Sequence, residues 1–76
     1  MVHAFVMVKV DSVDAGTVLD AVLGVDGVTE AHVVAGDFDI IAEVETEEVY
    51  DVLGAAATDV RSLEGVVDTK TYVALE

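Results

Sequence analysis

The segment Gly36-Asp37-Phe38-Asp39 contains residue types that could bind a small molecule. Glycine lets a backbone approach a ligand closely, adjacent peptide N–H groups can hold a carboxylate, and two aspartates can accept an ammonium group. These are the two charged ends of a free α-amino acid. The competing interpretation is a hairpin turn in which Gly36 adopts a positive φ and the aspartates cap backbone amides. Spacing alone leaves both interpretations open.

Thr69 and Thr71 share one side of a predicted final strand and could add hydroxyl groups to such a pocket. The competing interpretation is that they are residues that favour an edge strand. The candidate binding residues are therefore Gly36, Asp37, Phe38, Asp39, Thr69 and Thr71.

His3, His32 and Glu43 could share one face of a sheet and form a metal site or a proton-transfer group. We favour the simpler interpretation that each histidine pairs with a nearby acid. The sequence has no cysteine, and it lacks zinc-ligand spacings, glycine-rich phosphate loops and nucleophile motifs. We therefore expect neither an enzyme nor a bound metal or cofactor.

The first half of the chain predicts a strand, a helix and a hairpin. Residues 2–10 alternate an aliphatic set with a mixed set, which is typical of a strand with two different faces. Asp14 is a good N-cap, and Gly24 is a good stop for the helix between them. Strands over 28–35 and 38–45 then flank a tight Gly36-Asp37 turn.

The second half predicts another helix and a last strand. Thr46 is the expected N-cap, and Arg61 the expected C-terminal residue. A last strand follows over 66–75. The helix has an apolar stripe at helical spacing, which comprises Val49, Val52, Leu53, Ala56, Ala57 and Val60.

The element order is βαββαβ, and both halves carry an acid-Gly-Val turn, Asp26-Gly27-Val28 and Glu64-Gly65-Val66. Two interlocked split βαβ units predict an α+β, ferredoxin-like sandwich. Its four-stranded antiparallel sheet has the order 4-1-3-2, with two helices on one face. Residues 1–76 are then a single domain.

Two helices cover only one face of such a sheet, so the other face is open in a monomer. Its expected apolar centre and polar rim predict a sheet-to-sheet homodimer. The helix-facing layer comprises Ala4, Val6, Val8, Val10, Ile40, Ala42 and Val44. The open face carries Phe5, Met7, Val34, Ile41 and Tyr72, ringed by His3, Lys9, His32, Glu43, Glu45 and Lys70. A bulge near 69–71 would reverse the sides of the last strand.

The formal net charge of −13 arises from 16 Asp and Glu residues against 3 Lys and Arg residues. Such a chain repels nucleic-acid phosphates, so we expect no direct DNA binding. Abundant aspartate with few lysines suggests a halophilic surface; an ordinary acidic domain is the alternative. The sequence contains no signal-peptide pattern and no membrane span, so we expect a soluble cytoplasmic protein.

The run from Val33 to Val44, with Gly-Asp-Phe-Asp inside it, and the run from Leu63 to Val73, with Thr-Lys-Thr-Tyr inside it, resemble the effector domain of Lrp/AsnC transcription regulators. The resemblance covers essentially the whole chain. It implies a sheet-to-sheet dimer that often assembles into rings, with amino acids bound between dimers near the hairpin. By matching position, the ligand contacts are Gly36, Asp37, Phe38, Asp39, Thr69 and Thr71.

Full-length members of that family carry an N-terminal helix-turn-helix, whereas this sequence begins at the effector strand. The resemblance therefore implies a stand-alone sensing and oligomerisation module for transcription regulation that reaches DNA through full-length relatives. One alternative is a purely structural dimerisation domain. Another is a small dimeric enzyme of the monooxygenase or muconolactone-isomerase type, which needs a roomy pocket between sheet and helices.

Overall fold

Four strands and two helical regions alternate along the chain in the predicted βαββαβ order. This computed structural model describes residues 1–11 and 14–76, apart from the side chain of Ala57. The elements are β1 (Val2–Val10), α1 (Ala15–Leu23), β2 (Val28–Val33), β3 (Ile40–Thr46), α2 (Val49–Leu53), η1 (Gly54–Val60) and β4 (Val66–Val73). Within the described residues, no helix is long and apolar enough to cross a membrane.

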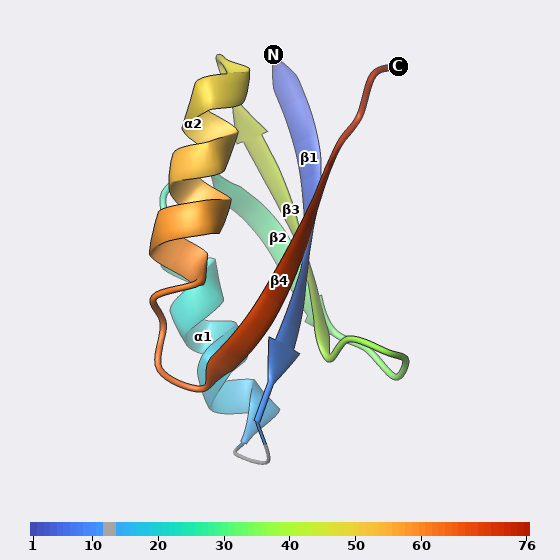
Figure 1. The fold of residues 1–76 in the computed structure, drawn as a ribbon, viewed down its shortest axis with the longest axis vertical. Helices are drawn as coiled ribbons and strands as arrows, with labels where there is room; N and C mark the ends of the chain where they lie inside the picture. Colours follow the sequence, from blue (N-terminus) through green and yellow to red (C-terminus); the bar gives the residue numbers. More distant parts are fainter. Residues whose placement is uncertain (12–13) are drawn as a thin grey trace.

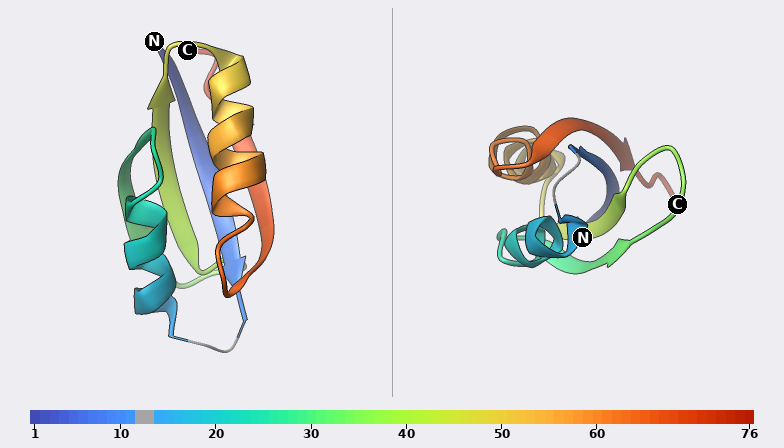
Figure 2. Two further views of the ribbon diagram at one scale, coloured as in Figure 1. Left: turned by 90° about the vertical axis from the view of Figure 1, so that its left-hand side faces the viewer. Right: turned by 90° about the horizontal axis from the view of Figure 1, so that it is seen from below.

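The strands form one antiparallel sheet in the order β2-β3-β1-β4, which is the predicted 4-1-3-2 order read from the other edge. Both helical regions lie on one face of the sheet (Figure 1). The β2–β3 connection and the C-terminal segment project on the opposite side, as the view from below in Figure 2 also shows. The ferredoxin-like fold and the open sheet face are therefore confirmed.

The core lies between the sheet and the helices and consists of small aliphatic side chains. On β1, Ala4, Val6 and Val8 are completely buried, while the residues between them face away from the helices. Such two-residue alternation follows from strand geometry, in which successive side chains point to opposite faces. The other buried residues are Val18, Val22, Ala31, Ile40, Ala42, Val44, Val52, Ala55, Ala56 and Val60.

The first helix begins and ends where its sequence predicts. Asp14 is the N-cap: its Oδ1 accepts a hydrogen bond from the Gly16 backbone N–H at 2.9 Å. Gly24 is the C-cap, in a right-handed conformation. Left-handed backbone occurs instead at Gly27 and Gly65, which both have a φ of 95° in the two acid-Gly-Val turns.

The second helical region begins later than predicted and buries a different stripe. Thr46 is the last residue of β3, and Glu48 is the N-cap residue. Leu53 is 52% exposed, and Ala55 is buried in its stead. The buried residues Val52, Ala55, Ala56 and Val60 form one stripe at helical spacing, and η1, which follows Leu53, is a π-helix. The predicted stripe was therefore wrong at Val49 and Leu53, both half exposed, and its Ala57 side chain lies outside the described part of the chain.

The orientation of β4 is set by an irregularity at its start. Lys9 pairs with Asp68, but Val10 pairs with Val66, so one residue of β4 is extra at this point. A bulge of this kind exchanges the faces of the residues on either side of it. Beyond it, the alternate residues Asp68, Lys70 and Tyr72 lie on the open face. The bulge lies at the beginning of β4, and not near residues 69–71 as considered from the sequence.

Candidate functional site

The β2–β3 connection is a six-residue loop over 34–39, and not the predicted two-residue turn. The Val34 N–H donates a hydrogen bond of 2.8 Å to the Asp39 carbonyl, which closes the loop. Among the described residues, positive φ occurs only at Gly27 and Gly65, so the expectation of a positive φ at Gly36 was wrong. A Cβ added to Gly36 would meet nothing within 4 Å. The fold of one chain therefore does not require glycine here, and the backbone is open to approach.

Asp39 anchors this loop to the end of β1. Its Oδ2 accepts a hydrogen bond of 2.9 Å from the Val10 N–H, and its own N–H donates one of 3.0 Å to the Val8 carbonyl. Lys9 adds a further tie, because its Nζ donates to the Asp37 carbonyl at 2.8 Å. The carboxylate of Asp39 is thus engaged by the fold. The carboxylate of Asp37 has no hydrogen-bond partner among the described residues.

A cavity of about 380 Å³ lies on the open sheet face against this loop. Its apolar part includes Met7 of β1 and Ile41 of β3, which are direct neighbours in the sheet. Asp37 and Lys70 supply opposite charges. The full lining is Met7, Val34, Ala35, Gly36, Asp37, Phe38, Ile41, Lys70 and Tyr72.

Cationic side chains are scarce in this protein, and this end of the open face has most of them. Of the three Lys and Arg residues in the chain, Lys70 lines the cavity and Lys9 binds its loop. In a chain with a net charge of −13, the carboxylate of a ligand is more favourable at this place than elsewhere on the surface. An apolar cavity with a few convergent polar groups is typical of small-molecule sites.

The structure brings together only part of the predicted site. Gly36, Asp37 and Phe38 line the cavity, and Asp39 lies at the end of the same loop. Thr69 and Thr71 do share one side, but they pair with Val8 and Val6 and so lie on the helix-facing side of the sheet.

The residues of β4 that line the cavity are Lys70 and Tyr72. They had been predicted for the open face but not for the site. The pairing of Tyr72 with Phe5, and of Lys70 with Met7, explains their position.

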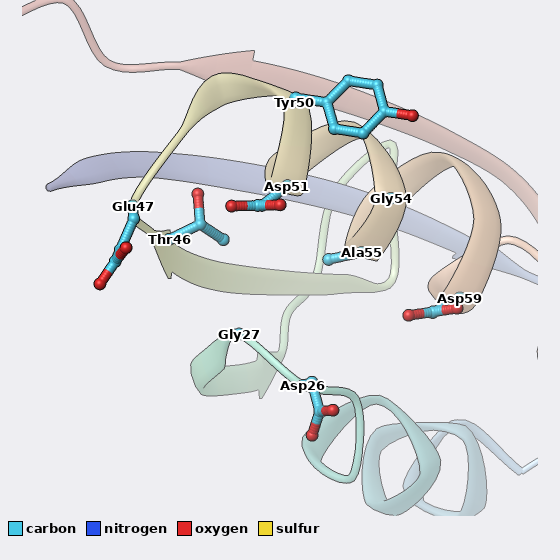
Figure 3. A pocket seen from close by; sticks show the side chains of 9 residues that line it. All are labelled: Asp26, Gly27, Thr46, Glu47, Tyr50, Asp51, Gly54, Ala55 and Asp59. Carbon is cyan, nitrogen blue, oxygen red and sulfur yellow. The ribbon is translucent and has the colours of Figure 1, made fainter.

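A second cavity, of about 360 Å³, lies between the turn before β2 and the second helical region (Figure 3). Four acids line it, Asp26 from the turn and Glu47, Asp51 and Asp59 from the helical side. It was not predicted from the sequence, because its two walls come from segments that are far apart along the chain. No group of three or more acidic or histidine side chains in the described part of the chain has an arrangement that could hold a metal ion.

Both histidines on the open face pair with acids, as we favoured from the sequence. His3 Nε2 lies 2.9 Å from Glu43 Oε1, and His32 Nε2 lies 2.9 Å from Glu30 Oε1. The hydrogen bond from His32 is the main reason why the pKa of Glu30 is lowered.

The space between sheet and helices holds completely buried side chains of the core, among them Val6, Val22 and Ile40.

Comparison with known proteins gives one consistent family. The family described as the Lrp/AsnC ligand binding domain matches residues 3–76. The leucine-responsive regulatory protein of Haemophilus influenzae is 32% identical over 56 residues, which cover 74% of this chain and 34% of that protein. The chain thus spans about a third of the length of this curated relative.

Solved structures agree. TTHA0845 from Thermus thermophilus superposes with a TM-score of 0.93 at 28% identity, over 100% of this chain and 95% of that one. The regulator NMB0573 of Neisseria meningitidis, solved as a complex with L-Met, shares the fold with a TM-score of 0.84 at 16% identity, over 99% of this chain and 50% of that one. The family match over nearly its whole length shows that this chain belongs to the Lrp/AsnC ligand binding domain family.

Proposed function

We propose that this protein is a sensing and oligomerisation module of transcription regulation that binds a free α-amino acid with an apolar side chain. The observation that carries the proposal is the cavity at the β2–β3 loop, in which Asp37 and Lys70 supply opposite charges beside an apolar floor. Membership of the Lrp/AsnC ligand binding domain family supports the class of ligand. The complex of NMB0573 with L-Met is a precedent within the same fold.

The two ends of the ligand have complementary partners in the cavity. The ammonium group of the amino acid binds the carboxylate of Asp37, which the described residues leave without a partner, and its carboxylate binds the ammonium group of Lys70. Gly36 leaves the backbone open beside them. The ligand side chain then contacts Met7 and Ile41, whose burial supplies the apolar part of the affinity.

The open sheet face supports a homodimer. Phe5 of the central strand β1 is 37% exposed, and its neighbour Tyr72 on the edge strand β4 is 54% exposed. The β2–β3 loop and the C-terminal segment project on the same side and flank this face (Figure 1).

The role in regulation is indirect and non-catalytic. A chain with a charge of −13 and three cationic side chains is repelled by DNA, so contact with DNA is made by other family members that assemble with it. Higher oligomers and mixed assemblies with full-length relatives follow as expectations. Co-purification from cells that contain such relatives tests this, and recovery of self-assemblies alone would contradict it.

The test of ligand binding is thermal unfolding in molar KCl against the twenty amino acids, with light scattering on the same samples. We expect a saturable rise in Tm for apolar amino acids, because a ligand that binds only the folded state stabilises it. Asp37→Ala and Lys70→Gln should each abolish the rise. Asp59→Ala, on the helical side, is the matched control and should retain it.

A purely structural dimerisation domain is the second candidate, favoured by the engagement of Asp39 within the fold. It predicts no Tm shift with any amino acid, alongside a stable dimer. A Tm shift that survives both Asp37→Ala and Lys70→Gln would instead contradict the cavity as the binding site.

A further inference from the structure

We propose that four side chains across the open sheet face form a pH-responsive contact, which tightens the pairing of two copies as the pH falls from 8 to 6. The four are His3, Glu43, Glu30 and His32, called here the His–Glu row. This inference rests on the sheet-to-sheet dimer of the proposed function, and concerns how that dimer is regulated.

The row follows from strand register. Glu30 of β2 lies opposite Glu43 of β3, so their side chains are direct neighbours on the open face. Each glutamate has its own histidine at 2.9 Å: His3 of β1 contacts Glu43, and His32 of β2 contacts Glu30. The row therefore spans three neighbouring strands.

The row borders the apolar centre of the open face. The ring of His3 packs against the ring of Phe5, with centroids 5.1 Å apart. The side chains of His3 and Glu43 are 40% and 27% exposed in one chain, so a second sheet laid on Phe5 would cover them further. Side chains that lose water on association respond strongly to a change of charge.

The charge of the row depends on the histidines. With neutral imidazoles it has two carboxylates and no cation, and with protonated imidazoles its charges cancel. A twofold dimer buries the same patch of both copies in one interface, so both rows belong to it. At pH 8 the carboxylates of both rows add negative charge to an interface between two chains that each carry −13. Protonation of imidazole, which occurs between pH 5 and 8, cancels the added charge and so reduces the repulsion.

Other charged groups on this face do not produce the same response. Glu45 pairs with His3 in the register of β1 and β3, and Glu76 lines the same surface cavity as His3 and Met1. These two carboxylates add negative charge around His3. From β1 and β4, Lys9 and Lys70 lie toward the other end of the face with the β2–β3 loop. The amino group of Met1 is retained in every variant below, so its contribution is separated from that of the row.

The test is the dimer dissociation constant at pH 6, 7 and 8 and one fixed KCl concentration, measured by sedimentation of a dilution series without amino acids. We expect the constant to fall by about tenfold from pH 8 to pH 6, which corresponds to a net uptake of about half a proton per dimer. In His3→Gln/His32→Gln, which retains hydrogen-bonding groups, the change should drop below about twofold. The control Asp59→Asn removes a charge on the helical side and should behave like the wild type.

A second variant keeps the test decisive if the first does not fold. Glu30→Gln/Glu43→Gln removes the two carboxylates and should give a tighter dimer at pH 8. Its dissociation constant should not fall toward pH 6 as the wild-type constant does, because protonated histidines then leave the row with a net positive charge. A wild-type dissociation constant that is the same at all three pH values, or a histidine variant with the full wild-type pH dependence, would overturn the row while leaving the dimer intact. A wild-type monomer at every pH would overturn the sheet-face dimer itself.

Discussion

The carboxylate of Asp39 accepts a hydrogen bond of 2.9 Å from the backbone N–H of Val10, 29 residues away in the sequence. This contact joins the end of the β2–β3 loop to the end of β1, where the register between β1 and β4 shifts at Lys9 and Val10. Asp39 thus supplies with its side chain an acceptor that a regular strand would supply with a carbonyl. Its place in the Gly-Asp-Phe-Asp segment is explained by the fold without any ligand.

We expect Asp39→Ala to lower the free energy of unfolding by about 1.5–3 kcal/mol without ligand, because it removes a charged acceptor from a part-buried N–H. Asp39→Asn retains an acceptor oxygen and should lose less. Urea unfolding in molar KCl measures both. Asp37→Ala is the control in the same loop, and equal losses for the two alanine variants would contradict the anchoring role of Asp39.

The glycines should differ sharply in their tolerance of alanine. Gly65 has a φ of 95°, and an added Cβ would lie 3.0 Å from Val18 Cγ2. Gly65→Ala should therefore cost about 1–2 kcal/mol or more, as measured by chemical unfolding. Gly36→Ala has open space and no positive φ, so it should be close to neutral in ligand-free protein. A Gly36 variant as unstable as the Gly65 variant would contradict this conformation.

The buried stripe of the second helical region predicts unequal effects for neighbouring residues. Val52 is completely buried, whereas Leu53 is 52% exposed. Val52→Ala should lower the free energy of unfolding by about 1–3 kcal/mol. Leu53→Ala should change it by about 0.5 kcal/mol or less, although it removes the larger side chain. Urea unfolding measures the loss for each variant. A larger loss for Leu53→Ala than for Val52→Ala would contradict the burial seen in the structure.

Glu30 should contribute to stability at mildly acidic pH and lose that contribution in stronger acid. Its pKa in the folded protein is lowered from the ordinary value of 4.5, chiefly by the hydrogen bond from His32. A lowered folded pKa means that the contribution is present above 4.5 and is lost as the pH falls through the folded value. The Tm difference between wild type and Glu30→Gln should therefore shrink from pH 5.5 to pH 3. A Tm difference that stays constant over this pH range would exclude the His32 contact as the source of the contribution of Glu30 to stability.

High salt should stabilise the protein or its dimer. The 16 acidic residues repel one another, and the range of that repulsion falls to about 3 Å in molar salt. Tm and mass by light scattering, measured from low to molar KCl, should both rise if the surface is halophilic. NaCl serves as a control for a specific effect of potassium. Identical stability across the series would contradict a halophilic surface.

Much of the architecture was readable from local patterns. The alternation in residues 2–10 predicted which side chains of β1 are buried, and the repeated acid-Gly-Val turns predicted the two matching turns that precede β2 and β4, where the structure has its positive φ backbone. Both signals act over a few residues, through strand pleating and the steric freedom of glycine. The helix N-cap at Asp14 is another local signal that the structure confirms.

The candidate site was predicted less completely, because it depends on register. Thr69 and Lys70 are adjacent in sequence, yet the bulge at the start of β4 directs the threonine to the helix side and the lysine to the cavity. A shift of one residue exchanges the two faces of a strand. The sequence placed Lys70 and Tyr72 on the open face, but only the register shows that they line the cavity beside the β2–β3 loop. The length of the β2–β3 loop was misjudged for a related reason, since Asp39 is held by β1 and not by its own hairpin alone.

The sequence by itself therefore determined the order of the elements, the aliphatic layer under the helices, the acidic surface and the loop that carries Asp37. These properties follow from short-range periodicity and charge, which each segment expresses independently of its partners. Only the tertiary structure decided that Asp37 shares a cavity with Lys70, that Glu30 meets Glu43, and that Leu53 faces outward. Those relationships join residues across strands or depend on which side of a helix packs against the sheet, so they exist only once the chain is packed.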